Sequence, residues 1–182
     1  PVSWMARNNY GLVLMNRGLY EEASKNFRLA VLLKPSGMLA RMNLARAYEC
    51  MGMTDGAMAR LNDALKQDPS NVRVRYEIGR IQFAQNRLAD ARTCFEQVLR
   101  KDPSFGRALV SLGLIAEKEG RMEEALDHMA KALDVSENDP EVFYAAGEFM
   151  YRRDNMEKAL KCYLRTAELD PFFPDIHNDI VI

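Results

Sequence analysis

A period of 34 residues runs through this sequence and constrains its fold more than any other feature. One unit of the period, residues 72–105, contains two amphipathic patterns on either side of Asn86. The first spaces Val74, Ile78 and Ile81 by four and three residues, and the second has the same spacing over Leu88, Ala91, Phe95, Val98 and Leu99. This spacing predicts two α-helices. A hairpin of two such helices cannot bury its apolar stripe alone, so it requires neighbours.

The units begin at Trp4, Met38, Val72, Gly106 and Pro140 and cover residues 4–37, 38–71, 72–105, 106–139 and 140–173. Position 8 of each unit is small: Gly11, Ala45, Gly79, Gly113 and Gly147. Position 20 is always alanine: Ala23, Ala57, Ala91, Ala125 and Ala159. Position 24 is large: Phe27, Leu61, Phe95, Met129 and Tyr163. Large residues facing small ones allow two helices to cross closely, so these positions are expected in the core.

Position 15 predicts the bend between the two helices of each unit. It holds residue types that tolerate a positive φ angle, which are Gly18, Gly52, Asn86, Gly120 and Asp154. Two aromatic residues that flank small positions, Tyr10 and Phe149, are also expected in the core.

These motifs resemble the tetratricopeptide repeat (TPR), whose small residue at position 8, Ala at 20, aromatic at 24, Ala at 27 and Pro at 32 are matched in most units. The departures are Gln82 and Ala116 at position 11, where Tyr is usual in the family, and Glu137 at position 32 in place of Pro. The resemblance implies an all-α fold. Its expected form is a right-handed α-solenoid of five helix-turn-helix units in one array over residues 1–182, with residues 174–182 starting a further or capping helix.

Composition excludes several classes of protein. The 182 residues carry a net charge of −1 and 48% hydrophobic residues, so neither disorder nor a strongly basic nucleic-acid-binding protein is indicated. No apolar run has transmembrane length, so no membrane insertion is expected. The cysteines Cys50, Cys94 and Cys162 are widely spaced and odd in number, which favours a reducing compartment and a cytoplasmic location. The chain starts at Pro1 and ends on Ile182, and it reads as a fragment of a longer chain.

No catalytic or metal-binding arrangement is recognisable. The histidines, His128 and His177, lie in different units and have no neighbouring ligand at metal spacing. Acidic pairs such as Glu21-Glu22 open second helices, where the helix dipole favours carboxylates. We therefore expect a non-catalytic protein that uses no cofactor and no metal.

In TPR arrays the first helices line a concave groove, and the resemblance assigns the groove position by position. Its first part is neutral, its middle part basic and aromatic, and its last part mixed. The expected peptide-binding residues are Asn8, Asn9, Leu12, Met42, Asn43, Arg46, Arg73, Tyr76, Arg80, Phe83, Arg107, Val110, Leu114, Tyr144 and Tyr151. Arginine suits carboxylates and the rings offer apolar contact, so the expected partner is a protein or peptide with an acidic segment.

Two interpretations of the four arginines in the expected groove are possible. The guanidinium groups of Arg46, Arg73, Arg80 and Arg107 would bind a ligand, or they would form exposed pairs with acids such as Glu49 and Glu77 on a solvated face. Asn9 and Asn43 share position 6 and suggest the start of an asparagine ladder, as in superhelical peptide-binding TPRs. The ladder stops there.

Chaperone-tail-binding TPRs clamp a terminal dicarboxylate with Lys, Asn, Asn, Lys and Arg at five set positions. The matching residues here are Asn8, Leu12, Asn43, Arg73 and Glu77. Only Asn43 matches, Arg73 is a conservative replacement for Lys, and Glu77 would repel a carboxylate. No binding to chaperone EEVD tails is expected.

The function implied by the resemblance is a scaffold or adaptor that holds a peptide or helix of a partner in the concave groove. One alternative is structural self-assembly, as a homo-oligomer or complex subunit, through the open C-terminal end. Another is a regulatory TPR region of a larger enzyme.

Overall fold

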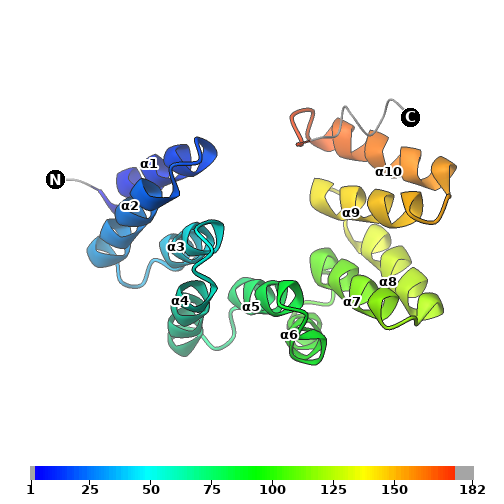
Figure 1. Cartoon of the computed structure of the whole chain (residues 1–182), viewed down its shortest axis with the longest axis horizontal. Coiled ribbons are helices and arrows are strands. Elements are labelled where there is room, and N and C mark those ends of the chain that lie inside the picture. The colour runs from blue at the N-terminus through cyan, green and yellow to red at the C-terminus, as the bar shows by residue number, and fades with distance from the viewer. Residues whose placement is uncertain (1–2, 175–182) are drawn as a thin grey trace. The chain divides into compact units, whose positions relative to one another are not determined.

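The structure is a computed structural model that describes residues 3–174, and every regular element within that range is an α-helix. The helices are α1 (Trp4–Asn16), α2 (Tyr20–Leu33), α3 (Met38–Cys50), α4 (Thr54–Gln67), α5 (Val72–Ala84), α6 (Leu88–Lys101), α7 (Gly106–Lys118), α8 (Met122–Val135), α9 (Pro140–Tyr151) and α10 (Met156–Leu169) (Figure 1). The first helix of each pair begins at the residue where the 34-residue period starts a new unit. The fold is that of helical TPR hairpins.

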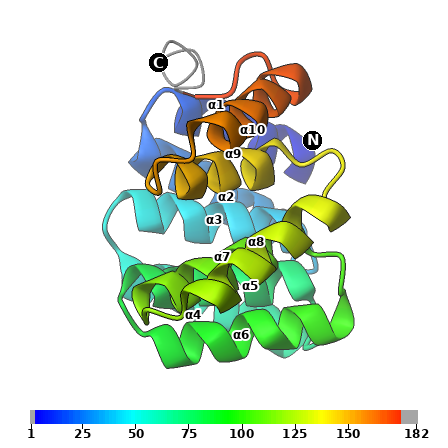
Figure 2. The ribbon, with the colours of Figure 1, turned by 90° about the vertical axis from the view of Figure 1, so that its right-hand side faces the viewer.

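The chain divides into two compact units, Pro1–Arg87 and Leu88–Ile182. The first unit holds α1 to α5, with α1 packed on α2 and α3 packed on α4. The second unit holds α6 to α10, with α7 packed on α8 and α9 packed on α10, as both ribbon views show (Figure 2). Helices also pack from one hairpin to the next within each unit, as α3 does on α2 and α9 on α8.

Each hairpin bends at a residue with a positive φ angle. These residues are Gly18, Gly52, Asn86, Gly120 and Asp154, with φ between 58° and 75°. At the first bend the Leu19 N–H donates to the Leu14 carbonyl at 3.0 Å and the Gly18 N–H donates to the Met15 carbonyl at 3.0 Å, which satisfies the last carbonyls of α1. The positive φ angle that the sequence predicts at position 15 is therefore confirmed at all five of these residues.

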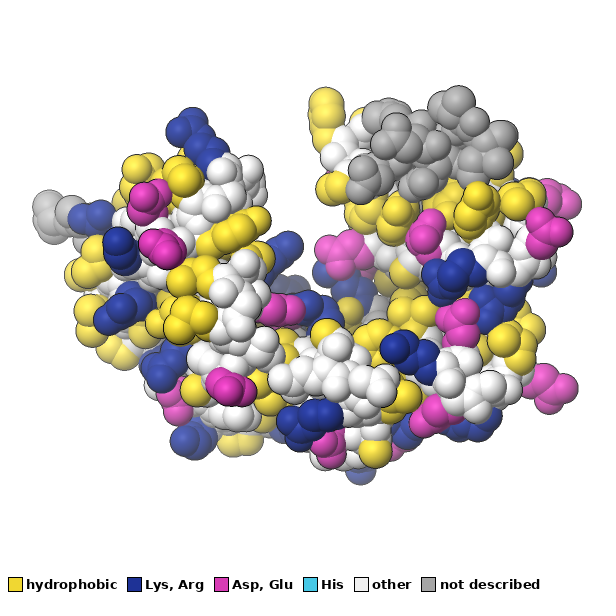
Figure 3. All heavy atoms as spheres, viewed as in Figure 1, with side chains coloured by type: hydrophobic (Ala, Val, Ile, Leu, Met, Phe, Trp, Pro, Cys, Tyr) yellow, Lys and Arg dark blue, Asp and Glu magenta, His cyan; other side chains and the backbone are white. Residues whose placement is uncertain are grey.

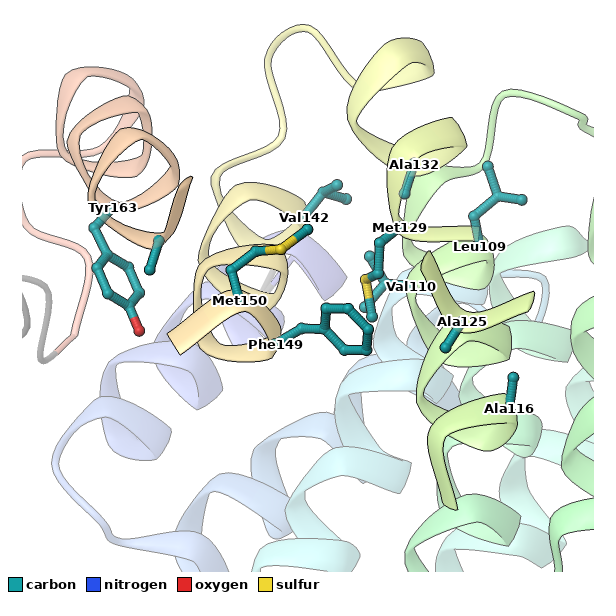
Figure 4. Packing of buried hydrophobic residues seen from close by; sticks show 11 residues of the cluster. Leu109, Val110, Ala116, Ala125, Met129, Ala132, Val142, Phe149, Met150 and Tyr163 are labelled. Carbon is teal, nitrogen blue, oxygen red and sulfur yellow. The ribbon is translucent and has the colours of Figure 1, made fainter. Parts of the chain in front are cut away.

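Small residues on first helices face large residues on second helices. A Cβ placed on Gly11 would lie 2.5 Å from Phe27 Cε1, and one on Gly147 would lie 2.6 Å from Tyr163 Cε1. Both aromatic rings are fully buried. In the second unit, Met129, Phe149 and their apolar neighbours form one continuous core (Figure 4). The absence of a side chain at position 8 is what allows these helices to approach.

Arginine side chains connect successive hairpins of the first unit through hydrogen bonds. Arg41 donates from Nε and Nη2 to the carbonyl of Pro35 at 3.0 and 2.8 Å, and Arg75 donates from Nη2 to the carbonyl of Pro69 at 2.7 Å. Both arginines occupy position 4 of their unit and both prolines close the preceding one. This contact fixes the entry of α3 and α5 and so orients the face on which the candidate site lies.

Two expectations have different outcomes. Phe149 is fully buried, as expected, but the prediction for Tyr10 is wrong, because its side chain is 54% exposed. The face of α1 that carries Tyr10 has no preceding hairpin packed on it within the described residues. The further helix expected from residue 174 falls almost wholly on residues 175–182, which lie outside the described residues, as does the open C-terminal end.

Candidate functional site

The predicted groove residues of α1 divide by burial. Asn9 and Leu12 are exposed, but Asn8 is buried, and its Oδ1 accepts a hydrogen bond from Asn43 Nδ2 at 2.9 Å. The amide pair thus joins α1 to α3 below the surface. The sequence predicts that Asn9 and Asn43 begin an asparagine ladder. In the structure the Asn43 side chain donates a hydrogen bond to Asn8 within the protein.

A pocket of about 100 Å³ lies between α3, α4 and α5 of the first unit. It is lined by Met42, Asn43, Ala45, Arg46, Glu49, Leu61 and Glu77. Met42, Arg46 and Glu49 follow one another on α3 at spacings of four and three, which places them on one helix face. One lining residue, Leu61, stands at the position that holds the larger Phe27 one unit earlier.

Arg80 is fully engaged by two carboxylates beside this pocket. Its Nε donates to Glu77 Oε2 at 2.9 Å and its Nη1 donates to Glu49 Oε1 at 2.8 Å, while Nη2 donates to the other oxygen of Glu49. Burial alone would lower the pKa of this guanidinium, but its hydrogen bonds to Glu49 and the charges of Glu77 and Glu49 outweigh burial and raise the pKa. Arg80 therefore ties α5 to α3 and neutralises much of the acidic wall of the pocket.

Arg46 and Arg73 differ from Arg80. Both are exposed, and within residues 3–174 neither has an ion pair with a carboxylate. Arg46 also lines the pocket. Tyr76 and Phe83, from the same helix as Arg73, are half-buried. The first unit thus combines a pocket of mixed apolar and charged lining with two guanidinium groups, of Arg46 and Arg73, that form no ion pair with its described carboxylates.

Most of the predicted groove residues of the second unit make contacts within the protein. Arg107 donates from Nε and Nη2 to Asp139 at 2.7 and 3.0 Å and pairs with Glu141 at 2.6 Å. Val110 is buried and Leu114 is half-buried against the core. The ring centroid of Tyr144 lies 4.9 Å from that of Phe173, and Tyr151 is exposed. This set does not present the free cations found in the first unit.

A pattern in the sequence marks these ion pairs. Glu49 and Glu117 both occupy position 12, and each pairs with arginine of the following hairpin. Glu117 accepts from Arg153 at 2.9 Å and from Arg152 at 3.1 Å, as Glu49 accepts from Arg80. An acid at position 12 followed 31 to 36 residues later by arginine would have identified the pairs of Glu49 and Glu117, but not the pairing of Arg107 with Asp139 and Glu141.

The described residues contain no group of three or more His, Cys, Asp or Glu side chains placed to hold a metal ion. None of the helices described here is long and apolar enough to cross a membrane. The first unit carries a pocket of mixed lining next to exposed guanidinium groups.

Sequence models described as tetratricopeptide repeat match residues 6–36, 38–81 and 76–142, which together make up most of the chain. The chain belongs to the tetratricopeptide repeat family. Its helical hairpins and their packing are those of TPR solenoids, and TPR repeats are generally found in protein-interaction scaffolds.

Solved structures show the same TPR fold at low sequence identity. A thermophilic TPR protein of Thermus thermophilus is 20% identical, with 98% of this chain and 97% of that chain covered and a TM-score of 0.82. PilF of Pseudomonas aeruginosa is 24% identical, with 91% and 76% covered and a TM-score of 0.71. MamA of Desulfovibrio magneticus RS-1 is 20% identical, with 94% and 97% covered and a TM-score of 0.62. No curated protein matches the chain by sequence.

Proposed function

We propose that this TPR protein is a non-catalytic scaffold that binds an extended segment of a partner protein on the first-helix face of its first unit. The observation that carries the proposal is the pocket beside Arg46, together with the lack of a carboxylate for Arg46 and Arg73 among the described residues. A partner segment with an aliphatic side chain next to an acidic residue fits this chemistry.

The roles of the arginines follow from their contacts. Arg46 and Arg73 are available to meet the partner's carboxylates through charge-assisted hydrogen bonds. Arg80 already holds Glu49 and Glu77, so it supports the pocket wall, and the apolar lining residues Leu61 and Met42 remain for the aliphatic side chain. Arg107 bridges Asp139 and Glu141 in the same manner and is a structural residue in this proposal.

The test reverses the charge of Arg46 and Arg73. Partners captured from native lysate by the wild-type chain would be compared with those captured by Arg46→Glu/Arg73→Glu, and the affinity for a synthetic segment of the captured partner would be measured by calorimetry. Loss of two charge-assisted contacts is expected to weaken binding by about a hundredfold or more. Helicity should be unchanged, because both side chains are exposed and have no ion pair within the described chain.

The matched control is Arg60→Glu/Lys66→Glu on the second helix α4, which makes the same change in net charge. These side chains are exposed and form ion pairs with Asp63 of their own helix, at 3.5 and 3.4 Å. The control should bind like the wild type. Equal binding by the groove variant and the wild type would overturn the proposal, and equal weakening in both variants would reduce it to a general charge effect.

A further inference from the structure

One face of α9 alternates carboxylates and tyrosines. Glu141, Tyr144, Glu148 and Tyr151 follow one another at spacings of three, four and three residues, which places them on one side of the helix. Glu148 is half-buried, and Tyr151 is 41% exposed. We call Tyr144, Glu148 and Tyr151 the α9 stripe. It belongs to the second unit alone and contains none of the residues that line the pocket of the first unit.

The face of α9 reverses the charge that the first unit carries at the same positions of the repeat. Position 9 is Arg46 in α3 but Glu148 in α9, and position 2 is Arg73 in α5 but Glu141 in α9. The first unit carries 13 basic and 7 acidic residues, which gives +6, whereas the second carries 12 and 19, which gives −7. Figure 3 shows acidic side chains spread over the visible surface of α7 to α10. The field of the second unit therefore favours a cationic ligand.

A buried hydroxyl group orients the carboxylate of Glu148. Its Oε1 accepts a hydrogen bond from the hydroxyl of Tyr163 at 2.5 Å, and Tyr163, which is 1% exposed, is fixed in the core of the second unit (Figure 4). A neutral hydroxyl leaves the negative charge of the carboxylate in place. The hydrogen bond also occupies only one of the two oxygens, so Oε2 remains for a donor from a ligand.

Two arginines beside α9 are already paired with other carboxylates. Arg152 donates to Glu117 at 3.1 Å, and Arg107 pairs with Glu141 at 2.6 Å. Within residues 3–174 Glu148 has no ion pair with a cation. Its charge is therefore able to attract a cationic group of a partner.

The accessibility of position 9 does not depend on the hairpin that comes next in the chain. Arg46 holds this position in α3 and stays exposed although α5 follows it in the same unit. Arg80 holds the position in α5, and it pairs with Glu49 of the preceding hairpin. Side chains at position 9 thus lie open or turn toward the hairpin before them, and the same holds for Glu148.

Two tyrosine rings flank the carboxylate on the helix. The ring centroid of Tyr144 lies 5.8 Å from that of Tyr163 and 4.9 Å from that of Phe173, so this ring is held in place by packing. Tyr151 follows Glu148 by three residues and is exposed. The face of a tyrosine ring attracts a cation that lies within about 6 Å of its centre. Arginine suits the combination better than lysine, because its planar group stacks on a ring while it donates to a carboxylate.

We propose that the α9 stripe binds the guanidinium group of an arginine side chain of a partner protein. The guanidinium donates to Oε2 of Glu148 and lies against the ring of Tyr151, while the ring of Tyr144 borders the site. This site goes beyond the recognition proposed for the first unit, because it lies in the other unit and takes a ligand of opposite charge.

The first test titrates the 182-residue chain, labelled with heavy isotopes in its tyrosines, with N-acetyl-arginine amide. Nuclear magnetic resonance would follow the ring signals, which are assigned by replacing each tyrosine in turn. The signals of Tyr144 and Tyr151 are expected to shift and to saturate, with weaker binding of the lysine analogue. The citrulline analogue has the shape of arginine without its charge, and it should cause no shift. Equal responses to arginine and citrulline, or no response to arginine at these two rings, would overturn the proposal.

The second test removes the charge of Glu148 without removing its hydrogen bond. In Glu148→Gln the side-chain oxygen can still accept from Tyr163, so the unfolding curve should match that of the wild type, whereas the affinity for N-acetyl-arginine amide should fall by about tenfold. Tyr151→Leu should weaken the same affinity by about threefold. Wild-type affinity in Glu148→Gln would refute the assignment.

The matched control is Glu96→Gln on α6, which removes one charge from an exposed carboxylate of the same unit. It should bind N-acetyl-arginine amide like the wild type, and a loss equal to that of Glu148→Gln would reduce the effect to the net charge of the unit and so contradict the site. Arg46→Glu/Arg73→Glu should also bind this probe with unchanged affinity. Failure of the first-unit proposal is thereby distinguished from failure of this one.

Discussion

Individual side chains of one type have different roles in this protein according to their partners. The guanidinium groups of Arg80 and Arg107 are each held by two carboxylates, whereas Arg46 and Arg73 meet none among the described residues. Reversal of Arg80 would break the link between α3 and α5 as well as change the surface. Experiments on recognition should therefore change Arg46 and Arg73 and leave Arg80 intact.

His128 is a residue whose ionisation is coupled to folding. Its Nδ1 is buried without a hydrogen-bond partner among the described residues, and its Nε2 lies 3.6 Å from Glu124. Burial lowers the pKa of His128, and this outweighs the nearby carboxylates Glu124 and Asp127, which act to raise it; Lys131 acts with burial. Glu124 is also held by Arg92 from α6 and by Arg121.

The sign of the resulting pH dependence is fixed. Because the folded pKa of His128 lies below the unfolded value, the unfolded chain binds more protons, and stability is lost as the pH falls from above about 6.5 toward the folded pKa. We expect the free energy of unfolding, measured by circular dichroism in urea, to decrease as the pH is lowered from about 7.5 to about 5.5. The slope should be smaller in His128→Gln, and equal slopes in the two proteins would contradict this assignment.

The first two hairpins bring their helices close together with different pairs of side chains. The first hairpin combines Gly11 with Phe27, whereas the second combines Ala45 with Leu61. A Cβ at Gly11 would overlap the Phe27 ring, since three ring atoms lie within 2.9 Å of it. A smaller residue on one helix therefore requires a larger one on the other.

This complementarity predicts a coupled pair of substitutions. Gly11→Ala should destabilise the first unit by about 1–3 kcal/mol through overpacking, and Phe27→Leu by about 1–2 kcal/mol through loss of buried contact. The double variant reproduces the second hairpin, so it should be less destabilised than the sum by about 1 kcal/mol. Fluorescence of Trp4, the one tryptophan, would follow urea unfolding of this unit.

The control is Gly113→Ala, where the nearest atom to an added Cβ is the flexible Met129 Cε at 3.1 Å. Because a methionine end can move and alanine favours the helix, this change should cost less than Gly11→Ala. Additive effects in the Gly11 and Phe27 cycle would show that the two side chains do not constrain one another.

At the scale of the whole molecule, the proposed pocket belongs to the first unit alone, because all of its lining residues lie between Met42 and Glu77. Changes to exposed residues of the second unit should therefore leave the affinity for the partner segment unchanged, which calorimetry would check.

The sequence predicts the helical hairpins well because their determinants are local and recur. Gly18 and Asp154 occupy the same bend, and Phe27 and Tyr163 the same core position, so five copies of the pattern support each inference. The core prediction for Tyr10 is wrong because its burial depends on a neighbouring hairpin and not on its own helix. Whether an arginine is paired depends on distances between helices, as between Glu49 and Arg80, which periodicity does not contain.

The hydrogen bonds from Arg41 to Pro35 and from Arg75 to Pro69 recur 34 residues apart, as do the bends at Gly18 and Gly52. A gene rearrangement that adds or removes one whole unit keeps every such contact with an equivalent partner. A shorter insertion would separate an arginine from its proline or shift a core residue to another face of its helix. Descendants of this gene should therefore differ in the number of complete repeats far more often than in the length of any one repeat.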